Sequence, residues 1–397
     1  MSEGDIAWVL VSSALVLFMT PGLALFYGGM VRAKNVLNML MMNFFTISIV
    51  TVVWVLIGWT LAFGGDGGGL IGNFSEAGLA GLSGESLLLA MFQMTFAIIT
   101  PALIAGAVAG RMKFSAWVLF TTLWAVLVYP VVAHWAWEGW LTELGAIDFA
   151  GGLVVHINAG VAALALVLVL GKRKGYPGEA FRPHSLPLTL VGTGILWLGW
   201  FGFNAGSALG AGDSAINAMV TTQIGAALGA LGWVAAEWRK TGTPTTLGVA
   251  SGAVAGLVAI TPAAGFVGPG WAFAFGLLAG VVCYFAVSLK YRFGYDDSLD
   301  VVGIHLVGGV VGSLLLGVVA QASIGGVDGA LYGNTALLGY QFVGVLAVLA
   351  YSFIVSWILA KVVDATVGLR AEPDYEEQGL DISLHGERAY VATDTGR

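Results

Sequence analysis

The sequence predicts an all-α integral membrane protein with eleven transmembrane helices, an outside N-terminus and a cytoplasmic C-terminus. Its composition is typical of a chain in lipid, because 58% of the residues are hydrophobic, 10% are charged and the mean hydropathy is +0.89. Apolar segments of about 20 residues, long enough to cross a bilayer, follow one another along the chain. All 16 Lys and Arg residues lie in every second gap between these segments or in the tail.

From the N-terminus onward, gaps that contain Lys or Arg alternate with gaps that contain neither. The basic gaps contain Arg32 and Lys34, then Arg111 and Lys113, then Lys172, Arg173, Lys174 and Arg182, then Arg239 and Lys240, then Lys290 and Arg292. The tail adds Lys361, Arg370, Arg388 and Arg397. The gaps near residues 64–86, 134–148, 210–215, 264–270 and 322–334 contain no Lys or Arg. Since cytoplasmic loops carry the excess of basic residues, the basic gaps are predicted to be cytoplasmic.

The spans divide into two sets of five and a last one. Spans 1–5 cover about residues 6–170, spans 6–10 about 186–321, and span 11 about 335–363. Because five is odd, the second set enters from the opposite side, which predicts a 5+5 inverted repeat with a site near the midplane. The spans therefore predict a transmembrane domain over residues 1–365 and a cytoplasmic tail over residues 366–397. Glycine, 59 of 397 residues, predicts closely packed helices.

The predicted outer side carries acidic residues and no basic ones. They are Glu3, Asp5, Asp66, Glu76, Glu85, Glu138, Glu143, Asp148, Asp213 and Asp328. Such a surface attracts cations. The alternative is that outer loops lack Lys and Arg only because membrane orientation requires it.

Each set of five closes with a helix that begins near an Asp and carries a His. These are Asp148 with His156 and Asp300 with His305. His156 lies roughly 12 Å into its helix, and His305 enters from the other side, so the two are expected within several ångströms of each other. Ionisable groups at that depth are functional candidates. The alternatives are structural hydrogen bonding between helices or a metal site, and no Cys, Asp or Glu at ligand spacing supports a metal.

Both Asp residues stand where helices start, the position at which a carboxylate accepts backbone N–H bonds. Capping is the expected role of Asp300. For Asp148 we expect capping together with an electrostatic role near the outer mouth of the site.

Aromatic and polar side chains share helix faces near the predicted outer mouth. The sets are Phe92 with Phe96, then Trp200, Phe203, Asn204 and Ser207, and the nearby Trp135, Trp137 and Trp140. Such a face suits a small desolvated cation, because a cation–π contact contributes roughly 0.5–2 kcal/mol. The alternative for any one aromatic is a lipid-facing anchor or a core filler.

These residues lie within long stretches that resemble the ammonium transporters of the Amt/Mep/Rh superfamily, in its Amt branch. The stretches are PGLALFYGGMVRAKN (21–35), FQMTFAIITPALIAGA (92–107), DFAGGLVVHINAG (148–160), PHSLPLTLVGTGILWLGWFGFNAGS (183–207), SGAVAGLVAITPAAGF (251–266) and VGLRAEPDYEEQGLDISLHGERAY (367–390). The resemblance covers nearly the whole chain.

The resemblance implies a role for each candidate residue. Phe92, Trp137 and Ser207 correspond to the outer ammonium recruitment site, and Phe96 and Phe203 to the phenyl rings that close the pore beneath it. His156 and His305 correspond to the paired pore histidines, and Asp148 to the Asp near the outer site. A homotrimer with one pore in each subunit is implied as well.

The chain departs from the family pattern at three places. Trp137, Glu138, Gly139 and Trp140 stand where the family usually has Trp-Gly-Gly-Gly. Gly110 replaces a common Glu, and Leu306 replaces the Gly that usually follows the second pore histidine.

The predicted function is ammonium or ammonia transport across the cell membrane, with recruitment and deprotonation of ammonium and conduction through a hydrophobic pore. No enzymatic activity, cofactor, metal or nucleic acid is expected. The tail resembles a cytoplasmic cap that helps a PII-type signalling protein block the pores. The alternative function is an ammonium sensor that signals through the tail, although a sensor is expected to carry an appended signalling domain after the position of Arg397.

Overall fold

The computed structural model describes residues 1–65 and 67–390, so that Asp66 and Arg397 of the predicted charge pattern lie outside the described residues. Within these ranges the chain consists of helices joined by loops, and Met112 and Arg370 form an antiparallel bridge. Ten helices are long and apolar enough to cross a membrane, and Thr246–Ile260 forms a shorter apolar helix. The predicted all-helical membrane class is therefore confirmed.

The first half of the chain runs from α1 to α8. Its elements are α1 (Glu3–Met30), η1 (Ala33–Asn35), α2 (Val36–Val53), η2 (Trp54–Gly58), α3 (Trp59–Phe63), η3 (Ala77–Leu79), α4 (Glu85–Val108), α5 (Phe114–Leu127), α6 (Tyr129–Trp137), α7 (Trp140–Leu144), η4 (Gly152–Ile157) and α8 (Asn158–Leu170). The segments η2 and η4 are π-helical turns that continue directly into α-helices.

The second half runs from α9 to the tail. Its elements are α9 (Leu186–Gly206), α10 (Asp213–Thr241), α11 (Thr246–Ile260), α12 (Pro269–Ala286), α13 (Leu289–Phe293), η5 (Val302–Leu306), α14 (Val307–Val319), α15 (Ala322–Gly325), η6 (Ala330–Tyr332), α16 (Thr335–Val367), α17 (Pro373–Gln378) and α18 (Leu380–His385). Like η4, η5 is a π-helical turn followed by a 13-residue α-helix.

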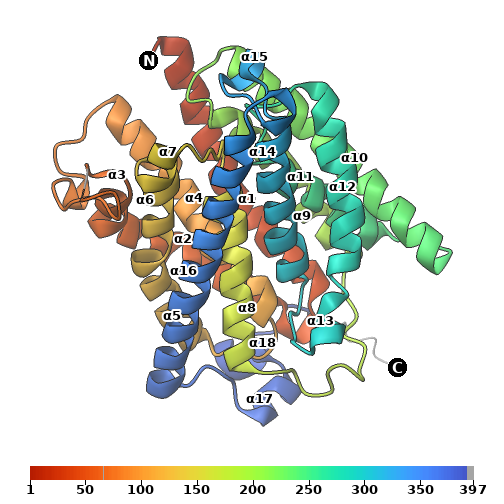
Figure 1. Ribbon diagram of the computed structural model, residues 1–397. Coiled ribbons are helices and arrows are strands. Elements are labelled where there is room, and N and C mark those ends of the chain that lie inside the picture. The colour runs from red at the N-terminus through yellow and green to blue at the C-terminus, as the bar shows by residue number, and fades with distance from the viewer. Residues whose placement is uncertain (66, 391–397) are drawn as a thin grey trace.

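Glycines let α1 and α9 lie directly against each other in the middle of the bundle (Figure 1). A Cβ atom on Gly192 would stand 2.2 Å from the backbone nitrogen of Phe26, and one on Gly22 would stand 2.5 Å from Ile195. Since lipid tails are as apolar as the side chains, such close contact is what holds membrane helices together. The close packing predicted from the glycine content is confirmed at this pair.

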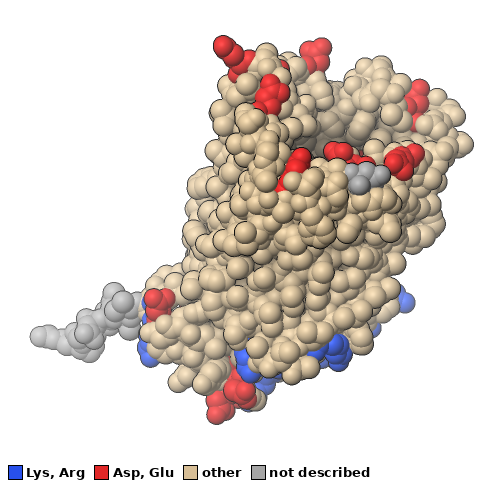
Figure 2. Space-filling model, turned by 90° about the vertical axis from the view of Figure 1, so that its left-hand side faces the viewer, with Lys and Arg blue, Asp and Glu red and all other residues tan. Residues whose placement is uncertain are grey.

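The charged side chains divide the molecule into two ends. Figure 2 shows Lys and Arg gathered at one end of the visible face and only Asp and Glu at the opposite end. We call these the basic end, which carries the tail helices α17 and α18, and the acidic end, which carries the N-terminus (Figure 1). The apolar bundle between them is where the candidate residues lie.

Candidate functional site

A cavity of about 220 Å³ opens at the acidic end of the bundle. Its lining contains the three residues predicted for substrate binding, Phe92, Trp137 and Ser207, which come from α4, α6 and the end of α9. The other lining residues are Phe63, Gln93, Phe96, Glu138, Phe149 and Leu209. The fold thus brings together side chains that are far apart in the sequence.

Hydrogen bonds hold the polar groups of this cavity in place. The indole N–H of Trp137 donates to the backbone carbonyl of Asp148 at 2.9 Å, which orients the ring. The hydroxyl of Ser207 donates to the carbonyl of Phe203 at 2.8 Å. Since its only proton is used there, Ser207 presents oxygen lone pairs, and therefore an acceptor, to a ligand in the cavity.

Two phenyl rings separate this cavity from the interior. Phe96 and Phe203 lie with ring centroids 4.2 Å apart and 33° between their planes. Phe92 packs edge-on against Phe96 at 5.0 Å, and both Phe96 and Phe203 are about 1% exposed. No open path leads past a contact of this kind without movement of the rings.

Asn204 is predicted to share the aromatic face of α9, and the structure gives it another role. Its side-chain amide donates to the hydroxyl of Thr222 on α10 at 2.9 Å, and the residue is fully buried. It lines neither this cavity nor the one below. Asn204 holds two helices together, so its prediction as a polar companion of the site was wrong.

Below the phenyl rings lies a small cavity that contains both histidines. It holds about 10 Å³ of space, close to the least that accommodates one water molecule, roughly 10–15 Å³. Apart from His156 and His305, its lining is apolar or aromatic: Met19, Leu23, Phe26, Ile99, Leu103, Val155, Leu196, Trp200, Phe203 and Val254. The interior is therefore narrow and poorly able to hydrate an ion.

The two histidines are in direct contact, as predicted. His156 Nδ1 and His305 Nδ1 lie 3.3 Å apart, and the rings are nearly parallel, with centroids 5.4 Å apart. Because one of these nitrogens must donate and the other accept, the pair shares a proton between two imidazoles. His156 Nε2 is buried without a hydrogen-bond partner among the described residues.

Both histidines occupy π-helical turns, His156 in η4 and His305 in η5. Such turns are rare and are frequent at functional sites. The ring of His156 also stacks on Trp200 at 5.6 Å and on Phe203 at 6.1 Å. The aromatic rings thus continue from Phe92 through Phe96 and Phe203 to the histidine pair.

Asp148 caps the helix that carries His156. One carboxylate oxygen accepts the backbone N–H groups of Gly151 and Gly152, and the other accepts those of Leu153 and Val154, at 2.7–3.2 Å. These are the orphan donors of a helix start. The predicted capping is confirmed, whereas the electrostatic role near the outer site stays a prediction.

The matching cap on the second histidine helix is Asp297, not Asp300. Asp297 accepts from the backbone nitrogen of Val302 at 2.7 Å. Asp300 instead pairs with Lys290 at 2.5 Å and has a left-handed backbone, with φ of 65°. The capping prediction for Asp300 was wrong, because the chain turns at Asp300 and brings the earlier carboxylate over the helix end.

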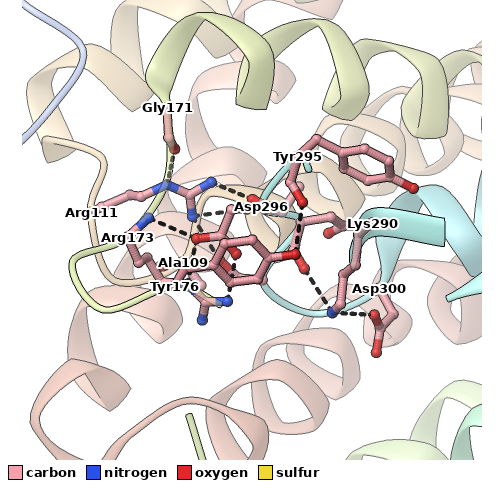
Figure 3. A network of polar contacts seen from close by, with 12 residues as sticks. Ala109, Arg111, Gly171, Arg173, Tyr176, Lys290, Tyr295, Asp296 and Asp300 are labelled. Atoms are coloured by element: carbon pink, nitrogen blue, oxygen red, sulfur yellow. Dashed lines mark hydrogen bonds and ion pairs between the residues drawn. The ribbon is translucent and has the colours of Figure 1, made fainter. Parts of the chain in front are cut away.

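The loops at the basic end form a polar network that the sequence did not reveal (Figure 3). The fully buried Arg111 donates to the carbonyls of Gly171, Ala107 and Asp296 and to the hydroxyl of Ser298. Arg173 forms a bidentate pair with Asp296 at 2.7–2.9 Å. The network joins loops from both halves of the chain below the pore.

In this network, burial and the nearby opposite charges have opposite effects on the pKa values of the charged groups. Burial lowers the pKa of Arg111 to about 10. Burial alone would raise the pKa of Asp296, but the hydrogen-bonded Arg173 and the nearby Arg111 bring it below its ordinary value. Arg111 and Asp296 are therefore both charged at neutral pH, and the charged Asp296 is the partner that the bidentate bonds of Arg173 require.

The tail is folded against the basic end. The backbone nitrogen of Lys113 donates to Leu369, and that of Ala371 donates to Arg111, at 2.9 and 2.8 Å. Asp381 of α18 accepts the backbone N–H groups of Leu37 and Asn38, so it caps α2 from the far end of the chain.

Four apolar tail residues, Leu369, Tyr375, Leu380 and Leu384, are predicted to anchor the tail. Leu369 and Leu380 are completely buried and Leu384 is half-buried. Tyr375 is 42% exposed in the single chain, so its anchoring role stays a prediction.

Two of the departures noted in the sequence have structural partners. Gly110 has a left-handed φ of +76°, and a Cβ there would stand 2.8 Å from the Asn35 amide. The backbone of Leu306 packs on Gly160, where an added Cβ would stand 2.4 Å from the Leu306 nitrogen. These contacts place Leu306 beside the helix of the other histidine.

Comparisons with known proteins match this chain to ammonium transporters along almost its whole length. The model of the Ammonium Transporter Family matches residues 7–390. The ammonium transporter Amt1 of Archaeoglobus fulgidus is 49% identical over 98% of this chain and 100% of its own. The crystal structure of Candida albicans Mep2 superposes with a TM-score of 0.90 at 35% identity, over 94% of this chain and 87% of that one. A structure named Sensor Amt Protein gives 0.92 at 29% identity, over 96% and 98%.

Proposed function

The chain belongs to the Ammonium Transporter Family, and on that premise we propose that it moves ammonium nitrogen across the membrane through the two cavities described above. It is a multi-pass protein of the cell membrane. The observation that carries the proposal is the continuous column of rings, with centroid distances of 5.0, 4.2, 6.1 and 5.4 Å from Phe92 through Phe96, Phe203 and His156 to His305.

Ammonium binds in the cavity at the acidic end. The faces of Trp137 and Phe92 attract its charge, and the acceptor oxygen of Ser207 takes one of its four N–H groups. Because Trp137 is held by its bond to Asp148, the ring is in place before the cation arrives. A preorganised site of this kind loses little entropy on binding.

The ion gives one proton to solvent water in the open cavity at the acidic end, and the resulting ammonia passes the phenyl rings. Moving a charge to the bilayer centre costs from about 2.5 to more than 10 kcal/mol, depending on the method. The cavity beside the histidines has room for about one water molecule and cannot offset that cost. Ammonia is neutral, and the imidazoles can donate to it or accept from it. Potassium has no proton to lose, so it is excluded.

We also propose the topology that the charge pattern predicts, with the acidic end outside and the basic end in the cytoplasm. The distribution of Lys and Arg in Figure 2 supports it. The 5+5 inverted repeat is supported by the way each half ends, in a π-helical turn that carries a histidine and continues as a 13-residue helix. The site then lies where the two halves meet.

The homotrimer and the PII-type partner rest on the family resemblance. The folded tail supports a cytoplasmic surface on which such a partner would act, because it reaches the loop of Arg111 and the start of α2. We propose a domain division into a transmembrane part over 1–365 and a regulatory tail over 366–397.

A sensor is the second candidate, favoured by the similarity to the Sensor Amt Protein. That similarity is 29% in sequence, whereas Amt1 of Archaeoglobus fulgidus is 49% identical. A sensor would bind ammonium without carrying it at a useful rate, so transport measurements separate the two functions.

Proteoliposomes that contain the purified protein test the proposal. Ammonium pulses are expected to produce a change of internal pH or a current, and equal potassium pulses are expected to produce neither. Binding of ammonium without either signal would favour the sensor, and the absence of both binding and signal would reject the proposed substrate.

Replacing Trp137 with Leu is expected to raise the half-saturating ammonium concentration, because the largest cation–π face of the cavity is lost. One such contact contributes roughly 0.5–2 kcal/mol, which corresponds to a roughly two- to thirtyfold increase. The matched control is Trp135→Leu, since Trp135 packs on Trp140 and Tyr351 and lies outside the cavity lining. Equal curves for the two variants, at equal membrane abundance, would contradict recruitment by Trp137.

Truncation after Asp364 is expected to lower transport and abolish binding of a PII-type protein while the membrane helices stay folded. The truncation removes Leu369, Asp381 and their bonds to the loop of Lys113 and to α2. Truncation after Tyr390 is the control, because it keeps both contacts. Full transport by the protein truncated after Asp364 would show that the tail has no influence on the pore.

A further inference from the structure

The cavity at the acidic end contains two polar side chains that have no role in the function proposed above, Glu138 and Gln93. Glu138 is the one ionisable residue in that lining, and it forms no ion pair within the described ranges. Gln93 Oε1 is buried and has no hydrogen-bond partner among the described residues. An unpartnered buried acceptor such as the Gln93 oxygen is unusual, since buried acceptors are nearly always bonded. Glu138 is exposed to solvent and at the same time lines the cavity.

Glu138 and Trp137 line the same cavity, and the backbone bonds at the end of α6 fix the position of both residues. Glu138 follows the last residue of α6, and the nitrogens of Glu138 and Gly139 both donate to the carbonyl of His134, at 2.9 and 2.6 Å. A Cβ on Gly139 would stand 2.7 Å from the carbonyl of Gly69, so the turn packs closely against that backbone and has no space for a side chain at this position. The turn that positions the aromatic ring therefore also positions the charge.

The second carboxylate near the cavity, that of Asp148, already accepts its full set of hydrogen bonds. Asp148 receives four backbone N–H bonds, two on each oxygen, and is 6% exposed. Its negative charge is spread over the helix start. A cation in the cavity consequently meets Glu138 as its accessible anionic group.

Gln93 offers a further acceptor. Its oxygen makes no hydrogen bond in the present orientation, so a turn of the amide breaks no bond of that oxygen. Terminal sp³–sp² torsions such as χ3 of Gln are broad, and a half-turn exchanges the two ends of the amide at low cost. After the half-turn the oxygen occupies the position at which the amide nitrogen stood.

We propose that Glu138 supplies a negative charge to the ammonium-binding cavity and sets its affinity for the cation, with Gln93 as an additional hydrogen-bond acceptor. This inference rests on the proposed function and concerns its substrate site. An ammonium ion in the cavity then meets aromatic faces, the Ser207 oxygen, the Gln93 amide and one carboxylate. The chain holds this carboxylate at the position where its family usually has glycine.

Glu138→Gln tests the charge with almost no change of shape. Glu143→Gln is the matched control, because Glu143 lies on α7 of the same end, is exposed and does not line the cavity. We expect Glu138→Gln to raise the half-saturating ammonium concentration roughly three- to tenfold at low salt, the effect of one partly exposed charge at short range. The difference should shrink at high ionic strength, where the charge is screened.

Two more variants separate charge from folding. Glu138→Asp keeps the charge and is expected to keep most of the affinity. Gln93→Leu is expected to raise the half-saturating concentration with no change in its salt dependence, since it removes a neutral acceptor. Glu138→Gln that matches Glu143→Gln at every salt concentration would overturn the role of Glu138, while ammonium transport by the unaltered protein would still support the proposed function. An unaltered protein that carries no ammonium would overturn the function itself.

Discussion

Replacing both His156 and His305 with Asp is expected to make the protein conduct potassium, which the unaltered protein excludes. The two imidazoles line the small inner cavity, which has about 10 Å³ of space and whose other lining residues are apolar or aromatic. Aspartates are smaller and strongly hydrated, so they admit water and lower the barrier to a permanent cation. Potassium currents across a planar bilayer measure the effect, which we expect to exceed tenfold, the ratio that corresponds to about 1.4 kcal/mol of barrier.

The variant with Leu at both positions is the matched control. Leucine also removes the hydrogen-bonding nitrogens but keeps the interior dry, so it should carry neither potassium nor a normal flux of ammonia. Potassium conduction by the unaltered protein, or by the Leu variant as strongly as by the Asp variant, would show that the histidines do not maintain the barrier.

Replacing Asp148 with Ala is expected to destabilise the protein severely and abolish transport. Its carboxylate is the partner of four buried backbone N–H groups at the start of η4, from its N-cap Gly151 to Val154. A buried donor left without a partner costs about 1–3 kcal/mol, while the whole stability of a protein is only about 5–15 kcal/mol. The turn that carries His156 and the carbonyl that holds Trp137 would both lose their positions.

Thermal unfolding in detergent and ammonium flux measure this prediction. Asp148→Asn, which can accept with one oxygen only, should lie between the unaltered protein and the Ala variant. Asp213→Ala is the control for loss of one charge at the acidic end, because Asp213 is exposed at the start of α10. An Ala variant at position 148 that unfolds at the same temperature as this control would contradict the capping argument.

The sequence by itself determined the membrane class, the division of charges between the ends and the pair of histidines. These are local properties. A span is recognised from consecutive apolar residues, a loop from its Lys and Arg, and a helix face from residues three or four apart, as with Phe92 and Phe96. The contact between His156 and His305 was predictable because each histidine stands at a known depth in its own helix.

Only the tertiary structure decided which residues complete the site and hold it. Arg111 and Asp296 are 185 residues apart in the sequence, and Asp381 and the Asn38 that it caps are 343 residues apart. Contacts between residues so far apart in the sequence form only when the loops fold back on the bundle. The second histidine helix is capped by Asp297 and not by the predicted Asp300, because Asp300 has a left-handed backbone and the chain turns there. Glu138 and Gln93 likewise became site residues only when five segments of the chain enclosed one cavity, since the residues that line a cavity are decided by packing and not by the neighbouring sequence.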